Sequence, residues 1–390
     1  MNFSHKLDAF EASIFTELLE AKLALRAKGM DTIDLSIGTP DLPPPEHVMR
    51  AISEAAMKPE NYIYAVKDRP QLLETVRSWY KRRFDVELDA QTQIVSLLGS
   101  QDGLAHLTMA LCDPGDVVLV PDPCYPIFAD GPRLNGCDVH YMAQPAENGY
   151  VIDFDRIDPE LAGRAKLMVV SYPNNPVASV ADEHFYEKLV AFAKKYDIAV
   201  LHDNAYSDLT FDDYTCGSFL RIPGAMDVGI EFNSLSKTYS MAGARIGFAL
   251  GNREMIKRLK SLKSNIDFGC FIPVQLGAEA ALNGPQDYIQ FMRSSYQRRR
   301  DVLIDGLAEA GWVITKPKAT MFVWAKIPEG YESARAFAYE LMEKTGVICV
   351  PGTAFGPCGE GHVRMALVQP EQTLAEAVRR IAASGMIGRK

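Results

Sequence analysis

Residues 233–247 read NSLSKTYSMAGARIG, and two apolar runs typical of strands, 228–232 and 245–250, enclose this stretch. Its one lysine, Lys237, stands among three serines and a threonine, and Arg245 follows it by eight residues. Hydroxyl groups, backbone N–H groups freed by glycine and a fixed positive charge are the groups that bind a phosphate. A lysine in their midst is a candidate covalent nucleophile toward a carbonyl. The stretch therefore predicts an anion site built around a reactive lysine.

The S-x-x-K core of this stretch, Ser234 to Lys237, is also found in serine acylases. Those enzymes need an S-D-N element elsewhere, and this sequence has none. A serine-rich loop that carries a surface lysine is the plainer alternative. The rest of the chain has to decide between these interpretations.

Length and composition limit the number of domains and the class of function. A chain of 390 residues is too long for one small core, so two domains are expected. The formal net charge of −9 argues against nucleic-acid binding through a basic face. The arginines 298–300 fall in a helical pattern, and we expect them to form a solvated helix face.

The cysteines and the amino terminus indicate the compartment. Seven cysteines without a C-x-x-C pair are typical of free thiols in a reducing environment, with neither a disulfide framework nor a zinc site. The seven histidines show no H-x-x-x-H pair, and no metal is expected. No apolar run has spanning length, so we expect a cytoplasmic protein without a membrane segment.

Strands and helices alternate along the first 283 residues, which predicts an α/β fold. Expected strands begin at Ile33 and cover 94–98, 116–120, 166–170, 198–201, 228–232 and 245–250. Expected helices cover 9–28, 46–57, 71–84 and 104–111, and another starts after an N-cap at Asp182.

The pattern changes after Asn283-Gly-Pro285 to a long helix at 286–310 followed by mixed elements. Strands are expected at 312–315, 321–326, 347–350 and 362–366, with helices at 333–344 and 371–384. This is an α+β pattern of domain size. We expect an arm at 1–35 that packs with the smaller domain, a large domain at 36–283 and a small domain at 284–390.

Candidate site residues follow several of these strands. The run 99–103, GSQDG, joins a strand to a helix start, where free N–H groups and the helix dipole favour an anion. Asp203 follows the apolar strand 198–201, where a partly desolvated carboxylate needs a cationic partner. Asn175 and Tyr125 stand in proline-rich turns, which in isolation are ordinary turns.

In their order and spacing these segments resemble the fold-type I pyridoxal-phosphate (PLP) aminotransferases of class I/II. The resemblance runs from about Ile33 to Arg364 and includes G-T-P-D at 38–41, D-x-x-Y at 203–206 and P-G-x-x-F-G at 351–356. It implies a three-layer large domain with a mixed, mostly parallel sheet, plus a smaller α+β domain. It also implies a homodimer with shared active sites.

By this resemblance Lys237 is the lysine that bonds to PLP, and Asp203 and Tyr206 complete the catalytic set. The residues that would hold the cofactor are Ser100, Gln101, Tyr125, Asn175, Asp203, Tyr206, Ser234, Ser236, Lys237, Arg245 and Tyr64. Gly38, Asn175 and Arg364 would bind the substrate. Tyr64, with Tyr62 as the reserve, would reach the phosphate of the partner subunit, although the family's glycine is missing from this segment.

The implied reaction is transamination between an L-amino acid and a 2-oxo acid. The overall pattern looks like the branch of LL-diaminopimelate, aspartate and alanine aminotransferases, and we favour LL-diaminopimelate with 2-oxoglutarate. Phe15, Asn265 and Asp267 are the positional candidates for reading the distal group. Alternatives within the fold are an aspartate or alanine aminotransferase, a β-lyase, a decarboxylase or a cyclopropane-forming synthase.

Two further alternatives lie outside this chemistry. A nucleotide-binding dehydrogenase would also be α/β, but the sequence has no G-x-G-x-x-G. A PLP-binding regulator or a non-catalytic scaffold would be expected to carry an appended segment for its partner, and no DNA-binding segment stands out.

Overall fold

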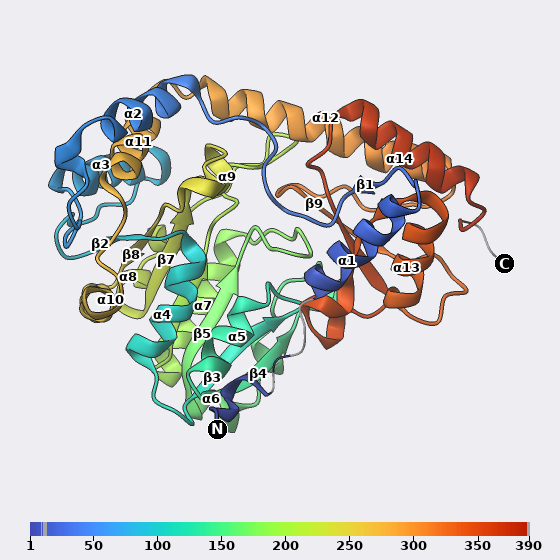
Figure 1. The fold of residues 1–390 in the computed structure, drawn as a ribbon. Coiled ribbons are helices and arrows are strands. Elements are labelled where there is room, and N and C mark those ends of the chain that lie inside the picture. The colour runs from blue at the N-terminus through green and yellow to red at the C-terminus, as the bar shows by residue number, and fades with distance from the viewer. Residues whose placement is uncertain (9, 11–13, 388–390) are drawn as a thin grey trace.

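The computed structural model describes residues 1–8, 10 and 14–387 (Figure 1). Its centre is a seven-stranded sheet in the order β2-β8-β7-β6-β5-β3-β4. The strands are β2 (Ile94–Leu97), β3 (Val117–Asp122), β4 (Asp138–Ala143), β5 (Ala165–Ser171), β6 (Ala199–Asp203), β7 (Gly229–Ser234) and β8 (Gly247–Gly251). Strand β8 is antiparallel to both of its neighbours, and the other pairs are parallel. The expected mixed, mostly parallel sheet is confirmed.

Both faces of this sheet are covered by helices, because successive strand residues point to opposite sides. Val117 and Leu119 of β3 join one apolar cluster, whereas Val118 and Val120 join another. The first cluster includes side chains of α3 (Pro70–Phe84), α7 (Glu183–Tyr196) and α11 (Ile272–Asn283). The second includes side chains of α4 (Ser100–Leu111), α5 (Ile127–Leu134) and α10 (Arg253–Ile266). The result is the expected three-layer α/β arrangement.

A second group of elements is built mostly from the carboxyl-terminal part of the chain. Its sheet has the antiparallel order β11-β12-β9, with strands Val350–Pro351, His362–Ala366 and Phe322–Lys326. The helices around it are α12 (Asp287–Glu309), α13 (Ala334–Thr345) and α14 (Glu371–Ala383). Helix α12 runs along the top of the view from the region of α2 (Glu46–Ala56) and α11 to α14 (Figure 1).

The amino-terminal segment packs on this second group. Helix α1 (Ile14–Ala27) lies beside α13 (Figure 1), and Glu17 accepts a hydrogen bond from Arg335 at 2.6 Å. Strand β1 (Ile33–Asp34) pairs in parallel with β10 (Val347–Ile348). Of the helix expected at 9–28, residues 9 and 11–13 lie outside the described part of the chain. The domain limits at 35/36 and 283/284 stay a prediction.

Two expectations for local structure are wrong. Helix α4 begins at Ser100 and not at Leu104, so Gly99 is its N-cap and the residues 100–103 form its first turn. The segment 312–315 forms no strand in the described structure, although Trp312 and Ile314 are buried in the second group. The Trp312 indole instead donates a hydrogen bond to the Lys326 carbonyl oxygen at 2.8 Å.

The prediction of a solvated arginine face at 298–300 is also wrong. Arg299 is 6% exposed, and its guanidinium donates two hydrogen bonds to Asp41 at 2.7 and 2.8 Å. Arg300 is 1% exposed and pairs with Asp212 and Asp301. Three consecutive helical residues point in directions about 100° apart, so they cannot all face solvent when the helix is packed. Only Arg298 has an exposed side chain, and it pairs with Glu371.

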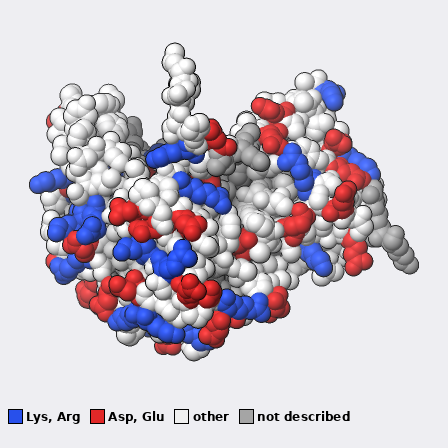
Figure 2. All heavy atoms as spheres, turned by 90° about the horizontal axis from the view of Figure 1, so that it is seen from below, with Lys and Arg blue, Asp and Glu red and all other residues white. Residues whose placement is uncertain are grey.

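The surface carries mixed charge. On the face seen in Figure 2, acidic and basic side chains are interspersed. Among the described helices, none combines the length and apolar character needed to cross a membrane.

Candidate active site

A cavity of about 600 Å³ lies where the large sheet, the amino-terminal segment and the second group of elements meet. It gathers every catalytic, cofactor-binding and substrate-binding residue that the resemblance implied except Tyr64, whereas the reserve Tyr62 and two positional candidates, Asn265 and Asp267, lie outside it. These lining residues are Gly38, Ser100, Gln101, Tyr125, Asn175, Asp203, Tyr206, Ser234, Ser236, Lys237, Arg245 and Arg364. Asn175, Asp203 and Lys237 come soon after, or at, the carboxyl ends of β5, β6 and β7, the edge where parallel α/β sheets place their ligands. The roles assigned to these residues stay predictions.

Lys237 projects into the cavity from a single helical turn, α9 (Leu235–Thr238), that follows β7 directly. Ser234 caps this turn by accepting a hydrogen bond from the Ser236 amide at 3.2 Å. The Lys237 ammonium donates to the Gly38 carbonyl oxygen at 2.6 Å. Burial, together with the nearby charges of Arg364 and Arg245, lowers the pKa of Lys237 to about 8. An amine with this pKa is partly unprotonated near neutral pH and can act as a nucleophile or base.

Asp203 ends strand β6 and is buried. Its Oδ1 atom is buried and has no hydrogen-bond partner among the described residues. Burial raises the pKa of Asp203 to about 6, against the opposing influence of His202, the Ala205 amide and Lys237. An unpaired buried carboxylate oxygen is costly unless a donor or cation reaches it. It therefore fits a ligand that presents a protonated ring nitrogen.

The amino terminus of α4 and the Arg245 side chain form a site suited to a dianion. Gly99 precedes α4 at φ +78°, and a Cβ atom built on it would lie 2.4 Å from Nη2 of Arg245. The guanidinium therefore packs directly against the helix start, beside the hydroxyls of Ser100, Ser234 and Ser236 in the same cavity. A helix amino terminus, a guanidinium and hydroxyl donors together bind phosphate.

Arg364, on β12, is a buried cation in the same cavity. It donates to the Asn175 Oδ1 atom at 3.0 Å and to the Ser36 carbonyl oxygen at 2.7 Å, while its Nε has no hydrogen-bond partner in the described part of the chain. Burial lowers the pKa of Arg364 to about 10, so it stays protonated near pH 7. No ion pair of the described chain includes Arg364. A buried guanidinium in this state is suited to bind a carboxylate through two parallel bonds.

Tyrosines occupy two further positions of the cavity. The Tyr125 hydroxyl donates to the Gln101 Oε1 atom at 3.1 Å. The Tyr206 ring lies edge-on to Phe322. Burial raises the pKa of Tyr206, so its hydroxyl is neutral and available as a donor. These groups fit an aromatic ring with an oxygen substituent.

Several predicted residues lie elsewhere. Tyr64 is 79% exposed and packs edge-on against Phe268, outside the cavity of its own chain. Tyr62 is likewise exposed. Of the candidates for reading a distal group, Phe15 lines the cavity, but Asn265 and Asp267 do not. Asp267 instead pairs with the Lys263 ammonium at 2.9 Å.

Sequence reasoning missed part of the lining. The additional residues are Ile37, Thr39, Leu104, Phe128, Ser171, Ala205, Ala242, Gly243 and Phe322. Phe322 is the most consequential, because the Arg364 guanidinium lies 4.2 Å from the centre of its ring. The signal that could have found it is the pairing of β9 with β12, which no short sequence window reveals.

Comparisons with known proteins agree with this geometry. The sequence model of the family described as "Aminotransferase class I and II" matches residues 30–381. A protein of Desulforudis audaxviator named LL-diaminopimelate aminotransferase is 47% identical over 365 residues, 93% of this chain and 92% of the relative. Further relatives with the same name are 40–45% identical. Glutamate-pyruvate aminotransferase AlaC of Escherichia coli is 40% identical, covering 97% of this chain and 92% of the relative.

The fold comparison gives the same result. The substrate-bound structure of BacF from Bacillus subtilis superposes with a TM-score of 0.96 at 35% identity, covering 100% of this chain and 99% of that one. A likeness of this extent includes every element that lines the cavity.

Proposed function

The chain belongs to the class I and II aminotransferases, and from that premise we propose that it binds PLP and moves the amino group of LL-diaminopimelate to 2-oxoglutarate. The observation that carries the PLP site is the single cavity that joins a reactive lysine, an unpaired buried carboxylate and an anion site. The choice of amino donor is supported by the relatives named LL-diaminopimelate aminotransferase, which are 40–47% identical.

Each part of the cofactor is assigned to particular residues of the cavity. Arg245, the α4 amino terminus and the hydroxyls of Ser100, Ser234 and Ser236 would hold the phosphate. Asp203 would bind the ring nitrogen. Asn175 and Tyr206 would bind the ring oxygen, and Tyr125 the ring face. When bound, PLP supplies an aldehyde that bonds to amines and a ring that withdraws electrons from the substrate Cα.

Substrate orientation is assigned to Arg364. Its guanidinium would bind the α-carboxylate through two parallel hydrogen bonds, and the Gly38 backbone would close the other side of this group. The rings of Phe322 and Phe355 lie 4.2 and 4.7 Å from the guanidinium carbon and hold its plane in place. A fixed carboxylate leaves the Cα–H bond of the substrate with few orientations, which is the purpose of such a clamp.

Lys237 is the residue assigned to proton transfer. With a pKa lowered to about 8, its amine can accept the proton from the substrate Cα and would return it to the former aldehyde carbon of the cofactor. Its hydrogen bond to the Gly38 carbonyl oxygen supports this assignment, because Gly38 is the backbone position assigned to the substrate carboxylate. Asp203 as a carboxylate keeps the ring nitrogen protonated, which favours electron withdrawal from Cα.

The experiment for the substrate compares amino donors with 2-oxoglutarate as acceptor and measures glutamate formed. We expect the highest kcat/KM with LL-diaminopimelate and a much lower value with meso-diaminopimelate, a matched control that differs at one stereocentre. Alanine or aspartate as the best donor would contradict this choice and favour the aminotransferase alternatives, of which AlaC is a relative. Release of ammonia or CO₂ in place of glutamate would favour a lyase or a decarboxylase.

The same proposal includes a homodimer in which Tyr64 reaches the partner's phosphate site. It is supported by an exposed apolar group formed by Tyr62, Ile63, Tyr64 and Val66 with Phe268, each 49–79% exposed. Exposed apolar groups of this kind mark interaction surfaces. A cytoplasmic location is also proposed, and it is supported by the seven free cysteines.

A further inference from the structure

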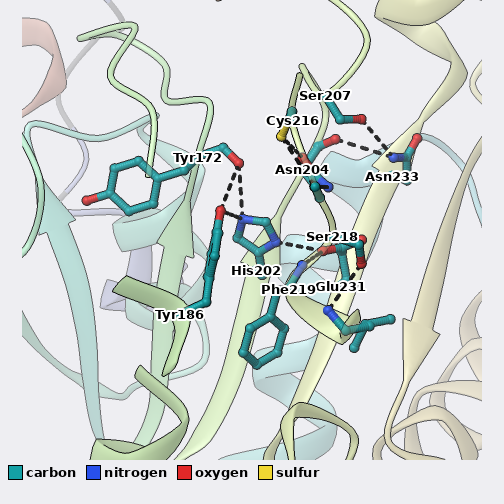
Figure 3. A network of polar contacts seen from close by, with 12 residues as sticks. Tyr172, Tyr186, His202, Asn204, Ser207, Cys216, Ser218, Phe219, Glu231 and Asn233 are labelled. Atoms are coloured by element: carbon teal, nitrogen blue, oxygen red, sulfur yellow. Dashed lines mark hydrogen bonds and ion pairs between the residues drawn. The ribbon is translucent and has the colours of Figure 1, made fainter. Parts of the chain in front are cut away.

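Behind the cavity lies a buried polar cluster that the proposed function does not use (Figure 3). His202 and Glu231 face each other in the register of β6 and β7, and both side chains are fully buried. The Nδ1 atom of His202 lies 2.8 Å from the Glu231 Oε2 atom. His202 directly precedes Asp203, the carboxylate at the edge of the cavity. The cluster therefore borders the site through the backbone of β6.

Glu231 is surrounded by donors. Its Oε1 atom accepts from the Tyr80 hydroxyl at 2.8 Å and from the Ser218 hydroxyl at 2.7 Å, and its Oε2 atom accepts from the Phe219 amide at 2.8 Å. The Ser218 oxygen accepts from the Leu220 amide, so its own proton points to Glu231. Among the described neighbours, only the His202 ring is left to take a proton from Glu231, and because a carboxylic acid is a stronger acid than an imidazolium, that proton lies on the ring. Glu231 is therefore ionised.

His202 is surrounded by acceptors. Besides the Glu231 carboxylate at Nδ1, its Nε2 atom lies 3.1 Å from the Tyr172 carbonyl oxygen and 3.2 Å from the Tyr186 hydroxyl oxygen (Figure 3). The Tyr186 hydroxyl donates to the same carbonyl at 3.4 Å, which leaves its lone pairs toward His202. With acceptors at both ring nitrogens, both carry protons, an assignment that follows from the partners. The pair is therefore an imidazolium and a carboxylate.

We propose that the His202 imidazolium, held in its charged form by Glu231, is a positioning residue that keeps the neighbouring Asp203 carboxylate ionised in the buried site. A positive charge one residue away interacts strongly in a low-dielectric interior. This inference rests on the proposed function only in that Asp203 is taken to bind the ring nitrogen of PLP.

The charges around Asp203 support this assignment. Burial raises the pKa of Asp203, and His202 is the largest influence that lowers it, ahead of Lys237 across the cavity. Glu231 acts in the opposite direction and more weakly. Tyr125 and Tyr206 are the other titratable groups that sense Asp203, and both stay neutral because burial raises the pKa of each. Removal of the His202 charge therefore leaves burial opposed mainly by the hydrogen bond from the Ala205 amide and by the charge of Lys237.

The test compares His202→Gln with Ser218→Ala. The first variant removes the charge and keeps hydrogen-bonding groups, and the matched control removes one neutral donor to Glu231 that does not line the cavity. The readout is the titration of the Asp203 carboxyl carbon by NMR in the apoprotein labelled at aspartate, assigned with Asp203→Asn. We expect the Asp203 midpoint to rise by roughly one pH unit in His202→Gln and to stay in place in Ser218→Ala.

A second readout is PLP affinity measured by absorbance. At pH 7 the PLP dissociation constant is expected to rise roughly tenfold in His202→Gln and to change little in Ser218→Ala, although both variants unfold at lower temperature. An Asp203 midpoint that does not move in a folded His202→Gln protein would overturn the proposal and leave the pair a purely structural one.

A measurement on the unmodified apoprotein covers the case in which the variant does not fold. With ¹⁵N-labelled histidine, we expect both ring nitrogens of His202, identified through contacts to Tyr186, to be protonated at pH 7. A neutral ring at this pH would overturn the proposal. If the unmodified protein bound no PLP, the proposed function would fail, whereas these apoprotein titrations would still decide the role of His202.

Discussion

Lys237 and Asp203 are opposite in charge type, and burial drives both toward their neutral forms. The pKa of Lys237 falls to about 8 and that of Asp203 rises to about 6. Such shifts destabilise the empty protein at neutral pH, as is usual where a site is built for chemistry and not for stability. A ligand that bonds to the amine and presents a cation to the carboxylate removes both penalties.

Replacement of Asp203 tests directly how much stability the apoprotein loses by burying an ionised carboxylate. Because the folded-state pKa is raised, the folded protein binds the proton more tightly than the unfolded chain. The penalty is absent below about pH 4, grows as pH rises toward 6, and is complete above it. We expect Asp203→Asn to stabilise the apoprotein against urea by on the order of 2–3 kcal/mol at pH 8 and by almost nothing at pH 4. Equal gains at both pH values would contradict the shift.

A substitution at Arg364 can test the shape of its side chain separately from its charge. Arg364→Lys keeps the positive charge but loses the planar fork and its packing on Phe322. We expect KM for the amino donor to rise about 10- to 100-fold, the value of one or two charge-assisted hydrogen bonds. Arg298→Lys on the exposed face of α12 is the matched control and should leave KM unchanged. A similar effect in both variants would remove Arg364 from substrate binding.

For individual residues, the sequence predicted which side chains line the cavity, but not which neighbouring groups hold each of them in place. Lys237, Asp203 and Arg364 could be found because their motifs recur in a fixed order. The aromatic rings that hold Arg364, the unpaired Oδ1 atom of Asp203 and the ionised pair behind it depend on strand pairing across distant segments. Short-range patterns carry no information about such contacts.

Among the elements, helix α4 shows how packing overrides local propensity. The GSQDG run was expected to join a strand to a helix at 104–111, and glycine is unfavourable in a helix interior. Gly103 is nevertheless helical, and a Cβ atom on it would lie 2.7 Å from both Leu97 and Phe232. The helix therefore tolerates glycine here because only a residue without a side chain lets α4 lie against the sheet. The earlier start places Ser100 at the anion site.

Gly99→Ala tests the link between this helix and Arg245. The new methyl group would face both an unfavourable φ of +78° and the Arg245 guanidinium. We expect a loss of about 1–2 kcal/mol in stability and at least a tenfold weaker PLP affinity, measured by absorbance titration. Gly115→Ala is the control, since its φ is +90° but nothing lies within 4 Å of the added Cβ. Equal PLP affinities in the two variants would contradict the role of Arg245 in phosphate binding.

The segment 312–315 shows that an alternating apolar pattern does not by itself produce a strand. Its alternation of apolar residues is real, because Trp312 and Ile314 are buried. Alternate burial, however, needs only a surface to pack against, whereas a strand also needs a partner with free backbone groups. Here the Trp312 side chain supplies the contact to β9.

For the whole molecule, the cavity exists because distant parts of the chain converge. Gly38 lies near the amino terminus, Lys237 directly after a strand of the large sheet and Arg364 near the carboxyl terminus. Asp41, three residues after Gly38, is held by Arg299 of α12, so the segment that borders the cavity is tied to the second group of elements. The α/β class was predictable from alternating elements, but this convergence followed only from the family resemblance.

The assembly offers a prediction at the same scale. We expect a dimer by light scattering, because the apolar side chains at 62–66 and Phe268 are exposed in one chain. If Tyr64 reaches the phosphate of a second subunit, Tyr64→Phe should weaken PLP affinity about tenfold without dissociating the dimer. Tyr62→Phe is the matched control. A monomer with full activity would contradict the shared site.

The most direct test of the account asks which amine carries the cofactor. The protein is loaded with PLP, reduced with borohydride, digested and analysed by peptide mass spectrometry, with Lys237→Ala treated in parallel. We predict the added pyridoxyl mass on Lys237 alone, and none in the variant. Label on a different lysine, or equal labelling of the unmodified protein and the variant, would contradict the account.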